Sequence, residues 1–171
     1  MKDSETGLTL EFLKTVLRYD PSTGTWTWLA PSTRWSRIKV GSEAGTISEG
    51  RYHMITVCGF QYKSHRLAFF YMTGKWPPST MDHEDLDKTN NKWTNIRPAT
   101  RQENGRNYPR QANNTSGRKC VSFDKRRGKF RAHIYVSKRQ KWLGYHDTAE
   151  QAHAAYADAA RELFGDFARI E

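Results

Sequence analysis

The stretch from Met81 to Asn107, M-D-H-E-D-L-D-K-T-N-N-K-W-T-N-I-R-P-A-T-R-Q-E-N-G-R-N, organises the rest of the chain. Asp82 and His83 place a carboxylate next to an imidazole near its start. A T-x-x-E pattern beginning at Thr100 is a capping box, which predicts a helix start with Asn104 in the first turn. A strand end, a polar loop and a helix N-terminus would bring Asp82, His83 and Asn104 toward one place. Carboxylate and amide oxygens suit a hard divalent metal and leave the imidazole as a base, so a nuclease-like site is predicted.

Length and charge narrow the class of protein. The chain has 171 residues, enough for one domain or two small ones, and a formal net charge of +10. This charge indicates a polyanionic partner, although a basic surface can also serve solubility alone. Cys58 and Cys120 form no C-x-x-C pair, which disfavours zinc fingers and disulfide scaffolds. Without a signal peptide or an apolar run of membrane length, we expect a cytoplasmic protein of a bacterial or phage-infected cell.

The stretch from His65 to Asn107 resembles the HNH family of ββα-metal nucleases, in particular the homing endonucleases of phages and introns. The resemblance rests on a spaced series of motifs: His65-Arg66-Leu67, Gly74 to Pro77, Asp82-His83, Asp87 to Asn91, Asn95 to Arg97 and Glu103-Asn104. The third letter of the family motif is Asn104 here rather than histidine. An amide oxygen still suits Mg²⁺ or Mn²⁺.

The resemblance implies a role for four residues of the site. His83 would be the general base that activates water. Asp82 and Asn104 would be the ligands of one divalent metal, Mg²⁺ or Mn²⁺, and Asn95 would brace the loop. The alternative for Asp82 and His83 is a buried ion pair that holds a turn. A calcium-binding loop after His83 is excluded, because the required glycine and terminal glutamate are missing.

The resemblance also places His65, Arg66 and Arg97 near the nucleic acid. For His65 and Arg66 the alternative is a helix-capping, surface role. Residues 30–45 form a basic, irregular stretch around Trp35, which is either a DNA-backbone contact loop or a solvated surface loop. The other N-terminal predictions are a helix over 8–18, a strand over 25–28, a hairpin over 52–63 and a helix from an N-cap at Ser64 to Gly74.

The pattern changes after Gly117. Three short strands are predicted over 119–123, 129–136 and 141–145, followed by a helix from a capping box at Thr148 to Gly165. Ten lysines and arginines but one acid stand between residues 118 and 141, which favours phosphate binding over a merely solvated face.

This C-terminal part resembles the plant APETALA/ethylene-response-factor DNA-binding domain, a three-stranded sheet backed by one helix. The motifs that carry the resemblance are Phe130-x-Ala132-x-Ile134, Trp142-Leu-Gly144, Thr148-Ala-Glu-x-Ala152, Ala155-Tyr156, Ala159-Ala160 and Gly165. Members of that family lay the sheet in the DNA major groove, and the resemblance implies the same for this sheet. The resemblance implies that the DNA-facing surface holds Lys119, Lys129, Tyr135, Lys141 and Trp142. Arg126, Arg127 and Arg131 would contact phosphates. Ser122 and Asp124 replace arginines of the plant family, so a different sequence preference is expected.

Together these patterns predict an α+β protein with a nuclease module over 1–107, a basic linker over 108–117 and a sheet-plus-helix DNA-binding domain over 118–171. The predicted function is a metal-dependent endonuclease that nicks or cleaves duplex DNA at selected sites. The expected partner is duplex DNA, with no membrane and no small-molecule cofactor, and the expected state is a monomer or weak dimer. One alternative is a non-catalytic DNA-binding regulator on the same scaffold. A toxin-like or RNA-directed nuclease is the other, which the major-groove type of sheet argues against.

Overall fold

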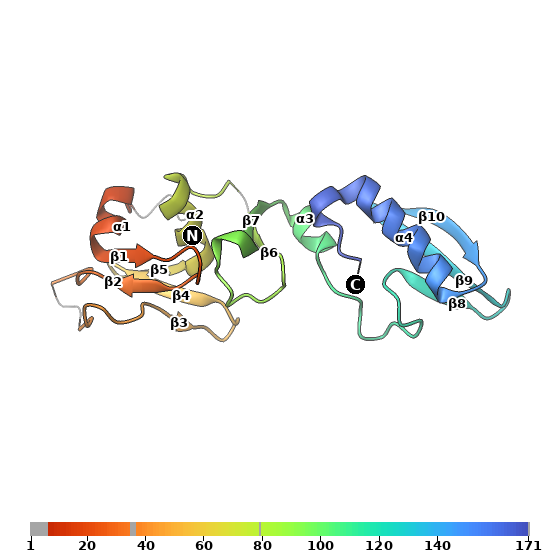
Figure 1. Cartoon of the computed structure of the whole chain (residues 1–171), viewed down its shortest axis with the longest axis horizontal. Helices are drawn as coiled ribbons and strands as arrows, with labels where there is room; N and C mark the ends of the chain where they lie inside the picture. The colour runs from red at the N-terminus through yellow and green to blue at the C-terminus, as the bar shows by residue number, and fades with distance from the viewer. Residues whose placement is uncertain (1–6, 35–36, 79, 171) are drawn as a thin grey trace. The chain divides into compact units, whose positions relative to one another are not determined.

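The computed structural model describes residues 7–34, 37–78 and 80–170. Trp35, at the centre of the predicted basic loop, lies outside these residues, so both alternatives for that loop stay predictions. Residue contacts divide the chain into two units, Met1–Arg101 and Gln102–Glu171. This division precedes the predicted end of the nuclease module at residue 107. Figure 1 shows the helices and strands of the chain, and each unit has hydrophobic clusters of its own.

The first unit consists of short strands and two α-helices, one before the first strand and one between the fifth and sixth strands. Its elements in chain order are α1 (Leu10–Val16), β1 (Leu17–Tyr19), β2 (Trp26–Trp28), β3 (Thr46–Ile47), β4 (His53–Val57), β5 (Phe60–Lys63), α2 (Ser64–Thr73), β6 (Thr80–His83), η2 (Trp93–Asn95) and β7 (Ile96–Ala99). β1 and β2 form an antiparallel pair, as do β6 and β7, and β4 lies between β3 and β5 in an antiparallel sheet.

One core connects the N-terminal strands to the β6–β7 hairpin. Trp26 and Ile55 are fully buried in it, and Met81 and Ile96 of the hairpin belong to the same cluster. The Tyr19 hydroxyl also donates a 2.6 Å hydrogen bond to the backbone carbonyl of Asn91. The segment before residue 60 is therefore part of the scaffold that holds the hairpin in place.

Two local predictions in this unit are wrong in detail. The helix predicted over 8–18 ends at Val16, because Leu17 is extended and pairs with Trp28 as the first residue of β1. Ser64 does not cap α2, since the N-cap is Lys63 and the buried Ser64 hydroxyl has no hydrogen-bond partner. The end of α2 is as predicted, with Gly74 in the left-handed conformation at φ 71°.

The second unit is an antiparallel sheet covered by one helix. Its elements are β8 (Val121–Asp124), β9 (Lys129–Val136), β10 (Arg139–His146), α4 (Ala149–Phe164) and η3 (Gly165–Phe167), and α3 (Arg101–Arg106) crosses the division between the units. The strand order is β10-β9-β8, and α4 covers one face of the sheet (Figure 1). The α+β class and the sheet-plus-helix arrangement are confirmed.

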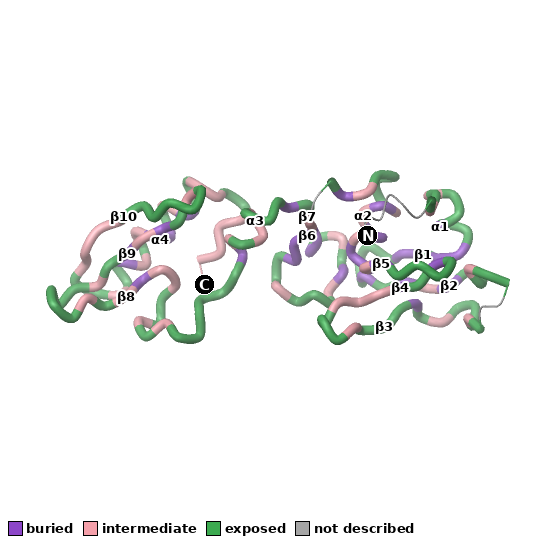
Figure 2. The backbone as a smooth tube through the Cα atoms, turned by 180° about the vertical axis from the view of Figure 1, so that it is seen from behind, coloured by how far each residue is buried: buried purple, intermediate pink, exposed green. Residues whose placement is uncertain are grey.

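Small side chains let α4 lie close to the sheet. Ala132 and Ile134 of β9 are buried, as are Ala152 and Ala160 of α4. Figure 2 draws buried segments of the chain in purple. The predicted capping box is present, since the Thr148 side chain accepts from the N–H of Gln151 and the Gln151 side chain accepts in return. No helix in the described ranges is long and apolar enough to cross a membrane.

Candidate active site and nucleic-acid interface

The β6–β7 hairpin positions the predicted catalytic residues. Asp82 lies directly opposite Arg97 across the hairpin, and His83 lies opposite Ile96. Both Asp82 and His83 are buried, with 2% and 5% of their surface exposed. A hydrogen bond from the Glu84 N–H to the Asn95 carbonyl closes the loop that follows, so the two residues stand at a fixed strand end.

The carboxylate of Asp82 faces a cation of the protein itself. Arg97 donates from Nε and Nη2 to Asp82 Oδ2, at 3.1 and 3.0 Å, and from Nη1 to Glu84 Oε1 at 3.0 Å. The Arg97 side chain is 18% exposed and that of Glu84 is 54% exposed. Arg97 was predicted to lie near nucleic acid, and here its guanidinium is part of the buried edge of the site.

The His83 ring is oriented by Asn91, a buried residue of the loop. His83 Nε2 lies 3.3 Å from Asn91 Oδ1, while Asn91 Nδ2 donates to the carbonyl of Thr89. In this orientation Asn91 turns its acceptor oxygen toward His83, and the contact is a hydrogen bond in the tautomer whose Nε2 carries the proton. The lone pair that can accept a proton is then on Nδ1.

Burial favours the neutral, basic form of His83. Desolvation lowers the pKa of His83 below its usual value. The hydrogen bond with Asn91 and the negative charges of Asp85, Asp82 and Asp87 act in the opposite direction. A neutral imidazole at ordinary pH is what a general base requires.

Asn95 braces the loop through both ends of its side-chain amide. Its Oδ1 accepts from the Asp85 N–H at 3.1 Å. Its Nδ2 donates to Asp85 Oδ1 at 2.9 Å and to the Asn90 carbonyl at 2.8 Å. The predicted bracing contacts are present, and they place Asn95 as a positioning residue for the loop.

His65 does not lie on the surface, so the helix-capping, surface alternative for it is wrong, and its place near the nucleic acid stays a prediction. The residue is 3% exposed, its ring centroid lies 4.8 Å from that of His83, and the two rings meet edge to face at 85°. Its Nδ1 has no hydrogen-bond partner. The first turn of α2 points His65 into the core, while Arg66, the next residue, is half-buried.

The two predicted metal ligands belong to different units. Asp82 belongs to the first unit, whereas Asn104 lies on α3 in the second. In the described part of the chain, no three His, Cys, Asp or Glu side chains are grouped to hold a metal ion. Asp82 nevertheless fits a cation, because it is a buried carboxylate that already binds a guanidinium. The pairing of Asp82 with Asn104 on one Mg²⁺ or Mn²⁺ stays a prediction.

Strand register decides which side chains of the second unit can face DNA. Residues directly opposite one another in an antiparallel pair share a face, and Ala132 and Ile134 mark the face that packs on α4. The other side, here called the outer face, holds Ser122, Asp124, Lys129, Arg131, His133, Tyr135, Gln140, Trp142 and Tyr145. Tyr135 and Trp142 are 56% and 48% exposed on it. The predicted positions of Lys129, Arg131, Tyr135 and Trp142 agree with this face.

Two of the predicted DNA-facing residues lie elsewhere. Lys141 is opposite Ile134, so it projects from the α4 side of β10. Lys119 precedes β8, and its ammonium donates to the backbone carbonyls of Arg106, Tyr108 and Arg169 at 3.0, 2.6 and 3.0 Å. Both assignments to the DNA-facing surface are therefore wrong, because strand register places Lys141 on the α4 side and backbone carbonyls hold the Lys119 ammonium.

Ser122 and Asp124 form contacts on the outer face itself. Ser122 Oγ accepts from Arg131 Nε at 2.7 Å, and Asp124 Oδ2 accepts from the Tyr145 hydroxyl at 3.1 Å. Asp124 Oδ1 also accepts the N–H groups of Arg126 and Arg127, which shapes the turn between β8 and β9. The Arg127 guanidinium lies 4.6 Å from the ring centre of Tyr145, and Lys129 pairs with Asp147 at 2.9 Å.

Two known protein families match segments of this chain, one in each part of the structure described above. Residues 62–106 match the HNH endonuclease family model, and residues 116–166 match that of the AP2 domain. Both resemblances are confirmed. A solved structure of DNA binding and cleavage by the HNH homing endonuclease I-HmuI is 27% identical, with a TM-score of 0.40 over 53% of this chain. The match covers 50% of that protein, and no curated protein sequence matches the chain.

The HNH-like segment, residues 62–106, leaves out a residue that the structure adds to the site. Tyr52 lies before it, with its ring 5.5 Å from that of His65 and 6.5 Å from that of His83. The Lys63 and Lys88 ammonium groups lie 4.1 and 4.9 Å from the centre of the Tyr52 ring. Sequence analysis missed Tyr52 as a site residue, since it lies outside the motifs that carry the resemblance. Asn91 appeared there only as the end of the Asp87 to Asn91 motif, and no role was predicted for its side chain.

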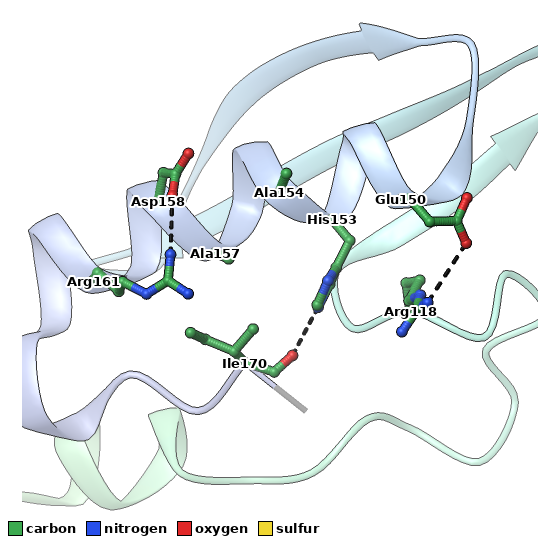
Figure 3. Close-up of a pocket in the computed structure, with 8 residues that line it drawn as sticks. All are labelled: Arg118, Glu150, His153, Ala154, Ala157, Asp158, Arg161 and Ile170. Carbon is green, nitrogen blue, oxygen red and sulfur yellow. Dashed lines mark hydrogen bonds and ion pairs between the residues drawn. The ribbon is translucent and has the colours of Figure 1, made fainter.

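The AP2-like segment, residues 116–166, also contributes to a hollow of about 310 Å³ beside α4 (Figure 3). The polar groups that line it are paired with their neighbours: His153 with the Ile170 carbonyl, Arg118 with Glu150 and Arg161 with Asp158. None of the predicted site residues lines this hollow. The contact of His153 with Ile170 joins the C-terminal tail to α4, and no residue predicted to bind DNA lines the hollow.

Proposed function

We propose that this chain is a metal-dependent endonuclease for duplex DNA, in which the HNH-like segment cuts and the AP2-like segment selects where. The observation that carries the proposal is the buried pair formed by Asp82 and His83 at the end of β6. Burial lowers the pKa of His83, which favours the neutral ring, and the contact of Nε2 with Asn91 leaves Nδ1 as the basic nitrogen.

In the proposed reaction, His83 accepts a proton from water through Nδ1. The water oxygen then attacks the scissile phosphorus, and the bond from phosphorus to the 3′ oxygen breaks. Asp82 and Asn104 would hold one divalent ion, Mg²⁺ or Mn²⁺. When bound, this ion supplies electrostatic stabilisation to the charge that develops on the phosphate. Asn95 keeps the loop rigid, so the base stays aligned.

The AP2-like segment would dock its outer face in the major groove. Trp142 and Tyr135 provide exposed rings there, while Arg126, Arg127 and Arg131 supply charge for phosphates. Because Ser122 and Asp124 stand at arginine positions of the plant family, the target should differ from the sites of the plant proteins.

A second function is favoured by one specific observation. Arg97 neutralises Asp82 in this structure, as it would in a non-catalytic DNA-binding regulator that kept the nuclease scaffold. Such a regulator would bind duplex DNA without cleaving it, whatever divalent metal is supplied.

Nicking of supercoiled DNA separates these two functions. The chain is incubated with a library of host and phage sequences in Mg²⁺ or Mn²⁺, with EDTA as a control. We expect metal-dependent open circles, and their yield should fall by about 10²-fold or more in His83→Ala with DNA binding retained. His153→Ala, in the AP2-like segment, serves as a matched histidine control. Undiminished cleavage by His83→Ala refutes the base assignment, and binding without cleavage across the library favours the regulator.

A further inference from the structure

Arg97 occupies the carboxylate that the proposed metal needs. We propose that Arg97 competes with the divalent ion for Asp82, so that its guanidinium holds the place of the ion in the free chain and leaves when the ion binds. This inference rests on the proposed function, since it requires Asp82 to be a metal ligand.

The contact is specific in its geometry. Nε and Nη2 of Arg97 both donate to the same oxygen, Asp82 Oδ2, while Nη1 donates to Glu84 Oε1. The direct cross-strand register of Asp82 and Arg97 on β6 and β7 sets the approach of the guanidinium. The position of the Arg97 guanidinium is therefore fixed by the hairpin, unlike that of a flexible ion pair on the surface.

Charge and burial explain why the two cations exclude each other. Asp82 is 2% exposed, so water cannot neutralise its carboxylate, and Arg97 does so instead. A divalent ion bound to either oxygen of Asp82 would be separated from the guanidinium by that carboxylate alone. The two positive charges would therefore repel each other. Glu84, with more than half of its side chain exposed, offers the displaced guanidinium a second carboxylate that it already contacts.

The displacement has a consequence for DNA. Once Arg97 leaves Asp82, its Nε and Nη2 donors are available to an anion such as a phosphate of the bound duplex. Metal binding and DNA binding then reinforce each other, because whichever binds first draws Arg97 away from Asp82 or keeps it away. Coupling between two binding equilibria is reciprocal by thermodynamic necessity.

The test measures metal affinity without DNA and without catalysis. Mn²⁺ is titrated into the full chain, and free Mn²⁺ is counted by its paramagnetic resonance signal. We expect Arg97→Gln to bind Mn²⁺ at Asp82 about tenfold more tightly than the unchanged chain. Arg18→Gln, which removes an equal charge from an exposed position on β1, should leave the affinity unchanged. Equal or weaker binding by Arg97→Gln overturns the proposal, since it would mean that Arg97 only orients the ligand.

Two further variants keep the result interpretable. Arg97→Lys retains a positive charge but loses the forked contact with Asp82. Its affinity for Mn²⁺ should therefore lie between that of the unchanged chain and that of Arg97→Gln. If circular dichroism shows that Arg97→Gln is unfolded, the Arg97→Lys variant is used in its place. An affinity of Arg97→Lys for Mn²⁺ no higher than that of the unchanged chain then overturns the proposal. Asp82→Asn identifies the site. If Asp82→Asn abolishes Mn²⁺ binding and Arg97→Gln gains none, the metal assignment stands and the competition is refuted. If the double variant Arg97→Gln with Asp82→Asn still binds Mn²⁺ tightly, the ion is not on Asp82. The metal assignment and the proposed competition then both fail.

Discussion

Acid should destabilise the first unit through His65, and replacing this residue with leucine should remove that part of the effect. His65 is buried at 3% exposure with an unpartnered Nδ1. Burial, followed by the charges of His83, Lys63 and Arg66, lowers the pKa of His65 to about 2. The unfolded chain binds a proton at this imidazole near its ordinary pKa of about 6.5. Between these two values only the unfolded state gains the proton, so stability is lost as the pH falls below the unfolded value.

The size of the effect follows from the two pKa values. Each pH unit within this window changes the free energy of unfolding by about 1.4 kcal/mol for one proton. Between about pH 7 and about pH 4.5 the unfolded imidazole titrates almost fully and the folded one does not, which amounts to about 2.5 kcal/mol. Other histidines whose pKa is lowered by desolvation, such as the half-buried His53, add to the total acid sensitivity and remain in the variant. The difference between the two proteins therefore isolates His65.

Urea unfolding at a series of pH values measures this difference. Tryptophan fluorescence reports mainly on the first unit, which holds Trp26, Trp28, Trp76 and Trp93. We expect the unchanged chain to lose about 2.5 kcal/mol more than His65→Leu over this pH range. His65→Gln is a matched control, because it keeps a polar side chain without a titrating group and should follow the leucine variant in slope. If the pH profiles of the three proteins run parallel, His65 does not titrate as its burial requires and the reasoning is refuted.

Two predictions concern the second unit. Lys119→Met should lower its free energy of unfolding by about 2 kcal/mol, because three backbone carbonyls lose a charged donor, and amide exchange at residues 106–108 should accelerate. Thermal unfolding and exchange that match those of the unchanged chain would contradict this role. Trp142→Ala should weaken binding to duplex DNA by about tenfold, whereas Lys141→Gln should have a smaller effect that disappears at higher salt, because Lys141 lies on the α4 side of the sheet. Fluorescence anisotropy across salt concentrations measures both, and a larger loss for Lys141→Gln would show that the outer face is not the one that binds DNA.

Local patterns were sufficient for many elements. Alternating apolar residues predicted β9 over its observed range, and the capping box at Thr148 predicted the start of α4. Gly74 ends α2 because a left-handed residue is needed there. The spaced motif also placed Asp82 and His83 together at a strand end. Each of these features depends on residues that are near one another in the chain, so the sequence pattern predicts them without knowledge of the fold.

The sequence by itself therefore determined the α+β elements, the two resemblances and the residues that carry the proposed chemistry. Only the tertiary structure decided that His65 faces inward against His83, that Arg97 binds Asp82 and that Lys119 joins three carbonyls instead of facing DNA. It also decided that Lys141 and Trp142, adjacent in sequence, belong to opposite faces of the sheet. The physical reason is the same in each case. Burial, strand register and long-range hydrogen bonds depend on which segments pack together, and no window of the sequence contains that information.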